Sequence, residues 1–228
     1  MVVAGKIFRL RENMDLSAIA AKLKNFRREE SYDEDPIHVK LLTEIHSLAL
    51  KESLLQGVFS QDIITYIFHH GERTPIPKTI ETSFAFVEQK ERVLLVVMER
   101  KLLANNIANR LSEALFITTG YITEASIPPE VLSSFHERNP ENTKIIFFDD
   151  VDIPNVNKLS LYGSGLMNTT LYSDYCSHGK IWYIVITSRK HGNIVGITRN
   201  AVVTIFNKVD KADYLNYVID EVFPLIKQ

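Results

Sequence analysis

Cysteine, long apolar runs and an excess of one charge are scarce or missing in this sequence of 228 residues. The single cysteine, Cys176, excludes an intrachain disulfide and the zinc sites that are built on paired cysteines. The longest apolar run, Val93 to Met98, is far shorter than the roughly 20 residues of a membrane-spanning helix. Since the N-terminus also lacks the pattern of a signal peptide, we expect a cytoplasmic protein with no membrane partner.

Recognisable catalytic motifs are missing as well. The seven histidines include no His-Glu-x-x-His pattern, which is typical of zinc proteases. Gly163-Ser164-Gly165 lacks the lysine and hydroxyl residue of a phosphate-binding loop. Cys176 and His178 lie two residues apart near Asp174, and side chains at that spacing do not meet on a helix. We therefore predict no cofactor, no bound metal and no catalytic residue from these patterns.

The composition is that of an ordinary folded protein. Hydrophobic residues make up 45% and charged residues 24%, far from the values that are typical of disorder. The formal net charge of −2 argues against a surface that is positive throughout, although it permits a local basic patch.

The first half contains clear strand and helix patterns together with ambiguous ones. Asp15 is suited to capping a helix that places Leu16, Ile19 and Leu23 on one face. The clearest hairpin joins Ser83–Val87 to Arg92–Met98. We further predict a strand over 2–10 and strands within 38–59, with a break at Gly57. Two more helices are predicted, one from Ser60 or Gln61 to His69-His70 with Gly71 as its C-cap and one over 102–116. Loops are predicted over 27–36, where the residues are solvated, and at Pro75 and Pro77.

The second half alternates short strands and helices. We predict a helical turn at 131–136, strands at 144–148, 158–162 and 181–187, a helix at 170–177, a hairpin across 194–206 and a final amphipathic helix. Short strands with hairpin-length connections favour antiparallel or mixed sheets. The expected fold class is therefore α+β, in two halves that each carry a mixed or mainly antiparallel sheet with covering helices. Prolines and Gly120 place a boundary near residue 120, between domains 1–118 and 119–228, although one compact unit is also compatible.

Two segments that contain acidic residues are candidate metal sites. Glu99 and Lys101 follow an apolar strand, as the Glu-x-Lys of some metal-dependent nucleases does, but the neighbouring strand offers no carboxylate before Glu88. Asp149, Asp150 and Asp152 follow another strand, where a solvated turn explains them better than a magnesium site. The nuclease remains an alternative interpretation.

Basic charge is concentrated between His178 and Lys211, where six lysines and arginines stand against Asp210 alone. Trp182, Tyr183 and Asn200 lie on the adjoining strands, so bases could stack beside the basic groups. Opposite charge in the preceding segment equally permits pairing between subunits. The predicted nucleic-acid-binding residues are Lys180, Arg189, Lys190, Arg199 and Lys208.

The order of elements in the front half, with Gln61-Asp62-Ile63-Ile64 and the stretch Ser83-Phe84-Ala85-Phe86-Val87-Glu88, resembles phage exclusion protein RexA and its KwaB-like relatives. The resemblance implies an intracellular role in antiviral defence against mobile elements, with sequence-independent DNA binding and no catalytic residue.

These observations favour a non-enzymatic, intracellular interaction protein that self-associates or binds another protein, and that contacts nucleic acid without sequence specificity. The alternatives are a metal-dependent nuclease that uses Glu99 and Lys101, and a structural module that binds only protein.

Overall fold

The structure is a computed structural model that describes residues 2–34, 37–90, 92–138 and 142–227. The described residues form an α+β fold that is dominated by antiparallel strand pairs. The chain divides into two compact units, which we call the central unit (Arg9–Thr123) and the terminal unit (Met1–Phe8 with Glu124–Gln228). It therefore passes from one unit to the other twice, after Phe8 and after Thr123. None of the helices in the described ranges is long and apolar enough to cross a membrane.

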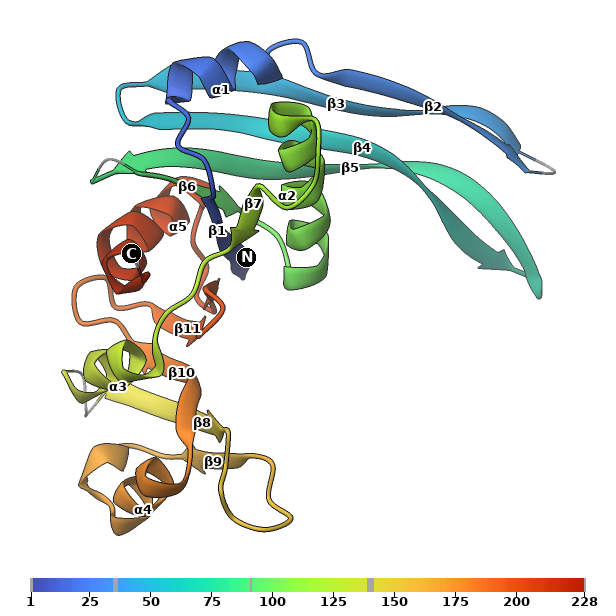
Figure 1. Ribbon diagram of the computed structural model, residues 1–228. Helices are drawn as coiled ribbons and strands as arrows, with labels where there is room; N and C mark the ends of the chain where they lie inside the picture. Colours follow the sequence, from blue (N-terminus) through green and yellow to red (C-terminus); the bar gives the residue numbers. More distant parts are fainter. Residues whose placement is uncertain (1, 35–36, 91, 139–141, 228) are drawn as a thin grey trace. The chain divides into compact units, whose positions relative to one another are not determined.

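The central unit is an antiparallel meander covered by two helices (Figure 1). Its strands follow the order β2-β3-β4-β5-β6, and α1 packs against α2 and against β3, β4 and β5. The elements are α1 (Leu16–Leu23), β2 (Arg27–Glu34), β3 (Ile37–Lys51), β4 (Leu54–His69), β5 (Glu72–Gln89), β6 (Arg92–Val97) and α2 (Lys101–Phe116).

Several predictions for this unit are confirmed. The Asp15 carboxylate accepts a hydrogen bond of 2.7 Å from the backbone N–H of Ala18, which satisfies a donor that the first turn of α1 leaves unpaired. The hairpin of Ser83–Val87 with Arg92–Met98 is the pairing of β5 with β6, and the helix over 102–116 is α2.

Four predictions for this unit are wrong. The charged stretch from Arg27 is not a loop but the edge strand β2, whose side chains are almost all exposed. The helix from Gln61 to His70 is instead the second half of β4, and Gly57 lies inside that strand rather than at a break. Pro75 and Pro77 lie within β5.

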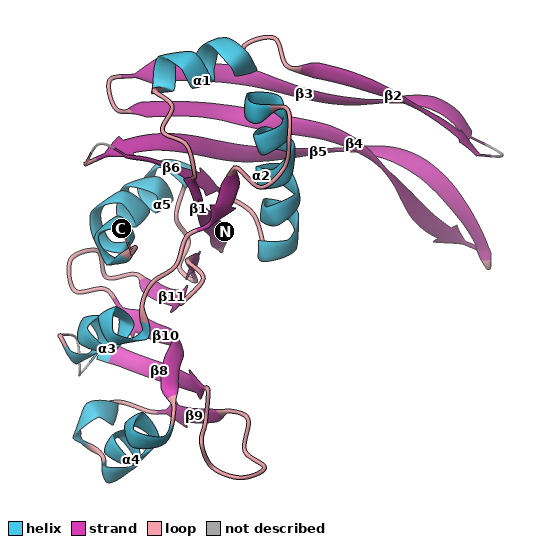
Figure 2. Ribbon diagram, viewed as in Figure 1, coloured by secondary structure: helices cyan, strands magenta, loops and turns pink. Residues whose placement is uncertain are grey.

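The strands of the terminal unit are also antiparallel, and helices cover one of their faces (Figure 2). Its strand order is β1-β12-β11-β10-β8-β9, and the predicted helices and strands of the second half are found within one to three residues. The elements are β1 (Val3–Leu10), β7 (Ile122–Glu124), α3 (Pro129–Glu137), β8 (Thr143–Asp149), β9 (Leu159–Tyr162), a 3-10 turn (Leu166–Asn168), α4 (Thr170–His178), β10 (Lys180–Thr187), β11 (Ile194–Thr198), β12 (Val202–Ile205), α5 (Lys211–Tyr217), a π turn (Val218–Val222) and a last 3-10 turn (Phe223–Leu225).

The core of the terminal unit lies between its sheet and these helices. Phe148 of β8 contacts the rings of Tyr172 and Tyr175 on α4. The buried Tyr214 of α5 donates a hydrogen bond of 3.1 Å to the Val203 carbonyl oxygen on β12. Since side chains alternate along a strand, the residues between these buried positions point to the opposite face of the sheet.

Candidate nucleic-acid interface

The structure separates the five predicted basic residues into two groups. Lys180 begins β10 and Arg199 follows the paired strand β11, whereas Arg189 and Lys190 lie in the turn beyond the other end of β10. A strand of this length spans about 25 Å. Lys208 belongs to the second group, because it lines a cavity of about 610 Å³ together with His191 of the same turn. The five residues therefore do not form one continuous basic surface.

The second group is matched by carboxylates of the C-terminal segment. Lys190 Nζ donates a hydrogen bond of 3.0 Å to Asp220 Oδ2 and lies 3.9 Å from Glu221 Oε1. The hydrogen bond to Asp220 raises the pKa of Lys190. Asp213 lines the cavity that contains Lys208. Basic and acidic side chains therefore lie next to each other at this end of the sheet.

The first group is also paired with acids, in a more buried setting. Arg199 Nη2 donates a hydrogen bond of 2.6 Å to Asp149 Oδ2, and Asp150 Oδ2 lies 3.5 Å from Arg199 Nη1 and 3.7 Å from Lys180 Nζ. Burial raises the pKa of Asp149, while the Arg199 charge opposes that shift. The second carboxylate oxygen of Asp149 is buried and has no hydrogen-bond partner among the described residues. The strand-end acids of the sequence analysis therefore anchor Arg199.

Aromatic side chains gather on the face of the terminal sheet that α3, α4 and α5 do not cover. The Phe147 ring lies at their centre, with its centroid 5.5 Å from Tyr183, 5.8 Å from Trp182 and 5.8 Å from Tyr162. Tyr162 is 64% exposed, and the other three rings are partly exposed. We call these four residues the aromatic face.

Lys158 adds a positive charge to the aromatic face. Its Nζ lies 4.8 Å from the centroid of the Trp182 ring, within the range of a cation–π contact. Lys158 and Phe147 also line a cavity of about 220 Å³ with Leu159 and Ser160. A planar group that stacked here would therefore meet both a ring and a cation.

A β-bulge and a glycine determine where the Trp182 and Tyr183 rings lie. The pairing of β10 with β8 shifts register between Ile181 and Tyr183, and the extra residue of this bulge is Trp182. The Tyr183 ring extends over Gly196 on β11, where a Cβ atom would lie 2.5 Å from the tyrosine oxygen. Gly196 is therefore the residue that lets Tyr183 lie flat on the sheet.

The other sequence candidates make local contacts of their own, and Glu99 and Lys101 belong to the central unit. Glu99 Oε1 accepts a hydrogen bond of 2.8 Å from the backbone N–H of Arg100, and Lys101 is the first residue of α2. His178 Nδ1 lies 2.7 Å from Asp152 Oδ1. Within the described ranges, no three histidine, cysteine, aspartate or glutamate side chains form a group that could hold a metal ion.

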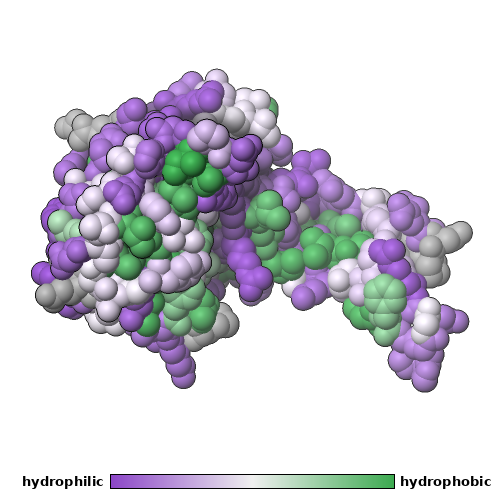
Figure 3. All heavy atoms as spheres, turned by 90° about the horizontal axis from the view of Figure 1, so that it is seen from below, coloured by the Kyte–Doolittle hydropathy of each residue, from purple (hydrophilic) through white to green (hydrophobic). Residues whose placement is uncertain are grey.

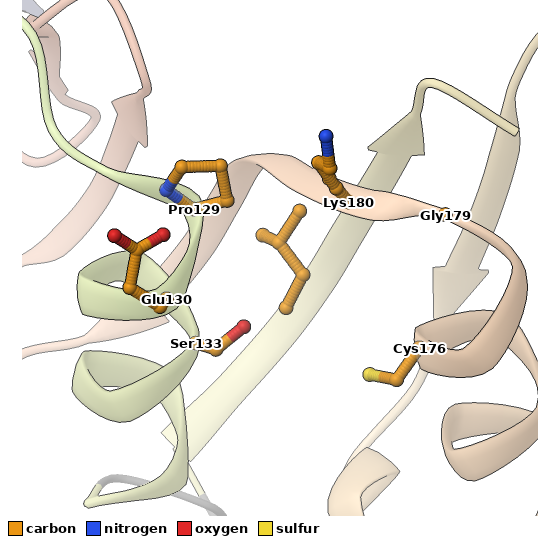
Figure 4. Close-up of a pocket in the computed structure, with 7 residues that line it drawn as sticks. Pro129, Glu130, Ser133, Cys176, Gly179 and Lys180 are labelled. Carbon is orange, nitrogen blue, oxygen red and sulfur yellow. The ribbon is translucent and has the colours of Figure 1, made fainter.

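A cavity on the helix-covered side of the terminal unit is lined by Cys176 of α4 and by Lys180 at the start of β10 (Figure 4). Its volume is about 370 Å³, and Glu130 and Ser133 of α3 line the opposite wall. Burial raises the pKa of the Cys176 thiol, although a hydrogen bond with Tyr172 opposes that shift. A raised pKa lowers the fraction of Cys176 that is present as the reactive thiolate at neutral pH.

Comparisons with known proteins give no relative from which a role can be transferred: no family model and no curated protein matches the chain. The resemblance to RexA and the KwaB-like proteins therefore stays a prediction.

The sequence analysis identified Trp182 and Tyr183 but missed Phe147, Tyr162 and Lys158. Phe147 and Tyr162 come from strands β8 and β9, and only the pairing of these strands with each other and with β10 brings the rings together. The alternation of Ile146 and Phe148 with Phe147 along β8 was the signal that Phe147 points away from the core.

Proposed function

We propose that this chain is a non-enzymatic binding protein whose aromatic face contacts single-stranded nucleic acid without sequence preference. The observation that carries the proposal is the cluster of four rings, one exposed and three partly exposed, with Lys158 over one of them. Proteins that bind single strands without sequence preference stack bases on aromatic side chains beside a positively charged groove. A sheet with helices on one face and aromatic side chains on the other is a common way to present such a surface.

The charges beside the aromatic face support the proposal in part. Lys158 lies over the Trp182 ring, and the backbone N–H of Arg199 donates a hydrogen bond of 2.9 Å to the Trp182 carbonyl oxygen. Asp149 and Asp150 pair with Arg199, and Asp150 also lies close to Lys180, so much of the charge of Arg199 and Lys180 is neutralised. We infer weak binding in which stacking contributes more than phosphate contacts. The resemblance to RexA and the KwaB-like proteins, which implies sequence-independent DNA binding, points the same way.

Fluorescence tests the proposal directly, because Trp182 is the sole tryptophan of the chain. Titration with an unstructured thymidine oligonucleotide of about 15 nucleotides should quench the emission of Trp182 as bases stack on the aromatic face. The affinity should fall only modestly as salt rises, because few phosphates are neutralised. A duplex of the same length should bind more weakly, since its bases are not free to stack.

Two kinds of variant distinguish the contribution of base stacking to binding from the contribution of charge. Tyr162→Ala removes an exposed ring and should weaken binding by about 5- to 100-fold, the range reported for loss of one stacked base. Lys158→Glu should weaken binding more than the double change Arg189→Glu and Lys190→Glu, which lies at the far end of β10. Unquenched emission, or quenching that survives Tyr162→Ala unchanged, would overturn the proposal. An oligonucleotide that is cut in the presence of Mg²⁺ would favour the nuclease instead.

A further inference from the structure

One carboxylate oxygen lies between two cations in the loop that follows β8. Asp150 Oδ2 is 3.5 Å from Arg199 Nη1 and 3.7 Å from Lys180 Nζ. Both distances are within the range of an ion pair, but they exceed the length of a hydrogen bond between nitrogen and oxygen. Two positive groups therefore converge on one point that an anionic oxygen occupies, and neither group is bonded tightly to that oxygen.

The neighbouring acid, Asp149, contacts Arg199 in a different way. Asp149 Oδ2 accepts a hydrogen bond of 2.6 Å from Arg199 Nη2, and the side chains of Arg199 and Asp149 are only 26% and 24% exposed. The backbone N–H of Arg199 also donates a hydrogen bond to the Trp182 carbonyl oxygen. Asp149 and the sheet therefore hold Arg199 in place without the help of Asp150.

Asp150 and Lys180 are, in contrast, side chains that solvent reaches. They are 57% and 62% exposed. An ion pair between exposed side chains contributes little to stability, because water screens it and both side chains lose freedom. The backbone of Asp150 is left-handed, with a φ of 50°, which residues other than glycine adopt at a cost in free energy. The fold therefore gains little stability from the position of the Asp150 carboxylate.

Lys180 lies on the same face of the terminal sheet as the aromatic rings. Side chains two positions apart on a strand share a face, and so do residues that are paired across two strands. Asp149 is two positions from Phe147 on β8, and Lys180 of β10 is paired with Asp149. In Figure 4 the amino group of Lys180 is directed away from the Cys176 thiol on the helix-covered side. The two cations therefore border the aromatic face.

A phosphate group is the ligand whose chemistry fits this point. A nucleic-acid strand carries phosphate oxygens beside its bases, and arginine and lysine are prominent among the side chains that contact them. The Asp150 carboxylate offers the same two cations an oxygen of the same charge. Figure 3 shows this end of the terminal unit with β9 and α4 nearest the viewer, and most side chains there are hydrophilic or intermediate. A carboxylate that leaves the two cations therefore moves into water.

We propose that Arg199 and Lys180 form a phosphate site at the border of the aromatic face, and that the Asp150 carboxylate occupies this site until a phosphate displaces it. The inference rests on the proposed function, because the ligand is the backbone of a strand whose bases stack on the rings. Asp150 is then a competitor within the chain. It weakens the binding of phosphate alone, so that a strand binds only when its bases stack as well.

Removal of the competing carboxylate tests the phosphate site. Asp150→Asn keeps the size of the side chain, and asparagine also tolerates the left-handed backbone. The thymidine oligonucleotide should bind this variant about 3- to 10-fold more tightly at low salt. The slope of log affinity against log salt should steepen by about 0.7 to 1.4, as expected for one or two more phosphate contacts. The matched control, Asp152→Asn, makes the same change of charge beside His178, 2.7 Å away, and should leave both values nearly unchanged.

Inorganic pyrophosphate distinguishes this inference from the proposed function, because it carries phosphate without a base. In a phosphorus NMR titration it should bind Asp150→Asn about threefold or more tightly than wild type. Adding Lys180→Gln to that variant should abolish the gain. Equal gains for Asp150→Asn and Asp152→Asn, or no gain for Asp150→Asn with pyrophosphate, would overturn the phosphate site. An oligonucleotide that leaves Trp182 unquenched, while pyrophosphate binds as expected, would overturn the proposed function alone.

Discussion

The two halves of the β4–β5 hairpin share one continuous ladder but have opposite surroundings. In the inner half, Phe59 and Phe84 are each 1% exposed, and α1 packs against both strands. In the outer half, equally apolar side chains such as Ile67 and Phe68 are exposed. The backbone pairing is therefore independent of the burial of the side chains that it carries. The inner half should set the stability of the central unit, and the outer half should contribute little to that stability.

The largest effect is expected from removing an inner aromatic ring. Phe59→Ala leaves a cavity in the best-packed part of the hairpin and should lower the free energy of unfolding by about 3–5 kcal/mol. Urea denaturation followed by circular dichroism measures this change. A loss below about 1 kcal/mol would mean that the inner half is not the core of the unit.

A smaller loss should follow from crowding the same half. The Cβ atom of Gly57→Ala would lie 2.7 Å from Phe84 Cζ and 2.9 Å from Leu48 Cδ1, so both side chains must move. We expect a destabilisation of about 1–3 kcal/mol in urea denaturation. Combining the change with Phe84→Leu should recover part of the loss, because the smaller side chain vacates the contact. Equal stability of the single and double variants would contradict this cause.

The boundary between the halves should respond to pH. Hydrogen bonds from the Thr79 hydroxyl and the Leu42 N–H lower the pKa of Asp62. Because the folded carboxyl has the lower pKa, its stabilisation is complete above the unfolded pKa of about 4 and is lost as pH falls through the folded pKa. Asp62→Asn should lower the free energy of unfolding by about 0.5–1 kcal/mol at pH 7. In urea denaturation at a series of pH values, the difference from wild type should shrink towards pH 3. A difference that is constant with pH would show that the charge of Asp62 is irrelevant.

The smallest effect on folding is expected at the outer end of the β4–β5 hairpin. Phe68→Ser removes a ring that is mostly exposed, so the free energy of unfolding in urea denaturation should change by no more than about 0.5 kcal/mol. A large loss of stability would mean that the outer end of the hairpin is part of the core after all.

Helices and strands could be predicted from the sequence where the local signals, such as caps and turns, agreed with the pattern of buried apolar residues. Asp15 before an amphipathic run predicted α1, and two apolar runs around a polar connection predicted the β5–β6 hairpin. The second half could be followed closely because its strands and helices alternate between buried and exposed positions over short distances.

The predictions of helices and loops were wrong where a strand has no buried face. Ile63, Ile64 and Ile67 fit a helical stripe, yet they are β-branched residues of a ribbon with two exposed faces. His70-Gly71 resembles a helix C-cap because the left-handed conformation that ends a helix also forms a two-residue hairpin turn. Two prolines suggested a loop, but both lie on a free strand edge, where a missing N–H costs nothing.

The candidate interface was predictable only in part. Trp182 and Tyr183 were found because they adjoin a basic segment, whereas Phe147 and Tyr162 depend on the order of strands in the sheet. Acidic partners of Lys190 and Arg199 lie 30 and 50 residues away along the chain, so a count of local charge overestimated how basic the surface is.

The pairing of Val3 with Ile205 also has a consequence for synthesis on the ribosome. The first strand of the chain joins β12, one of the last, so the terminal sheet cannot close until about nine-tenths of the chain has been translated. The central unit needs no residue after Thr123 and can fold long before that point. During this interval the nascent chain carries a folded central unit while the strands of the terminal sheet still await their first and last partners.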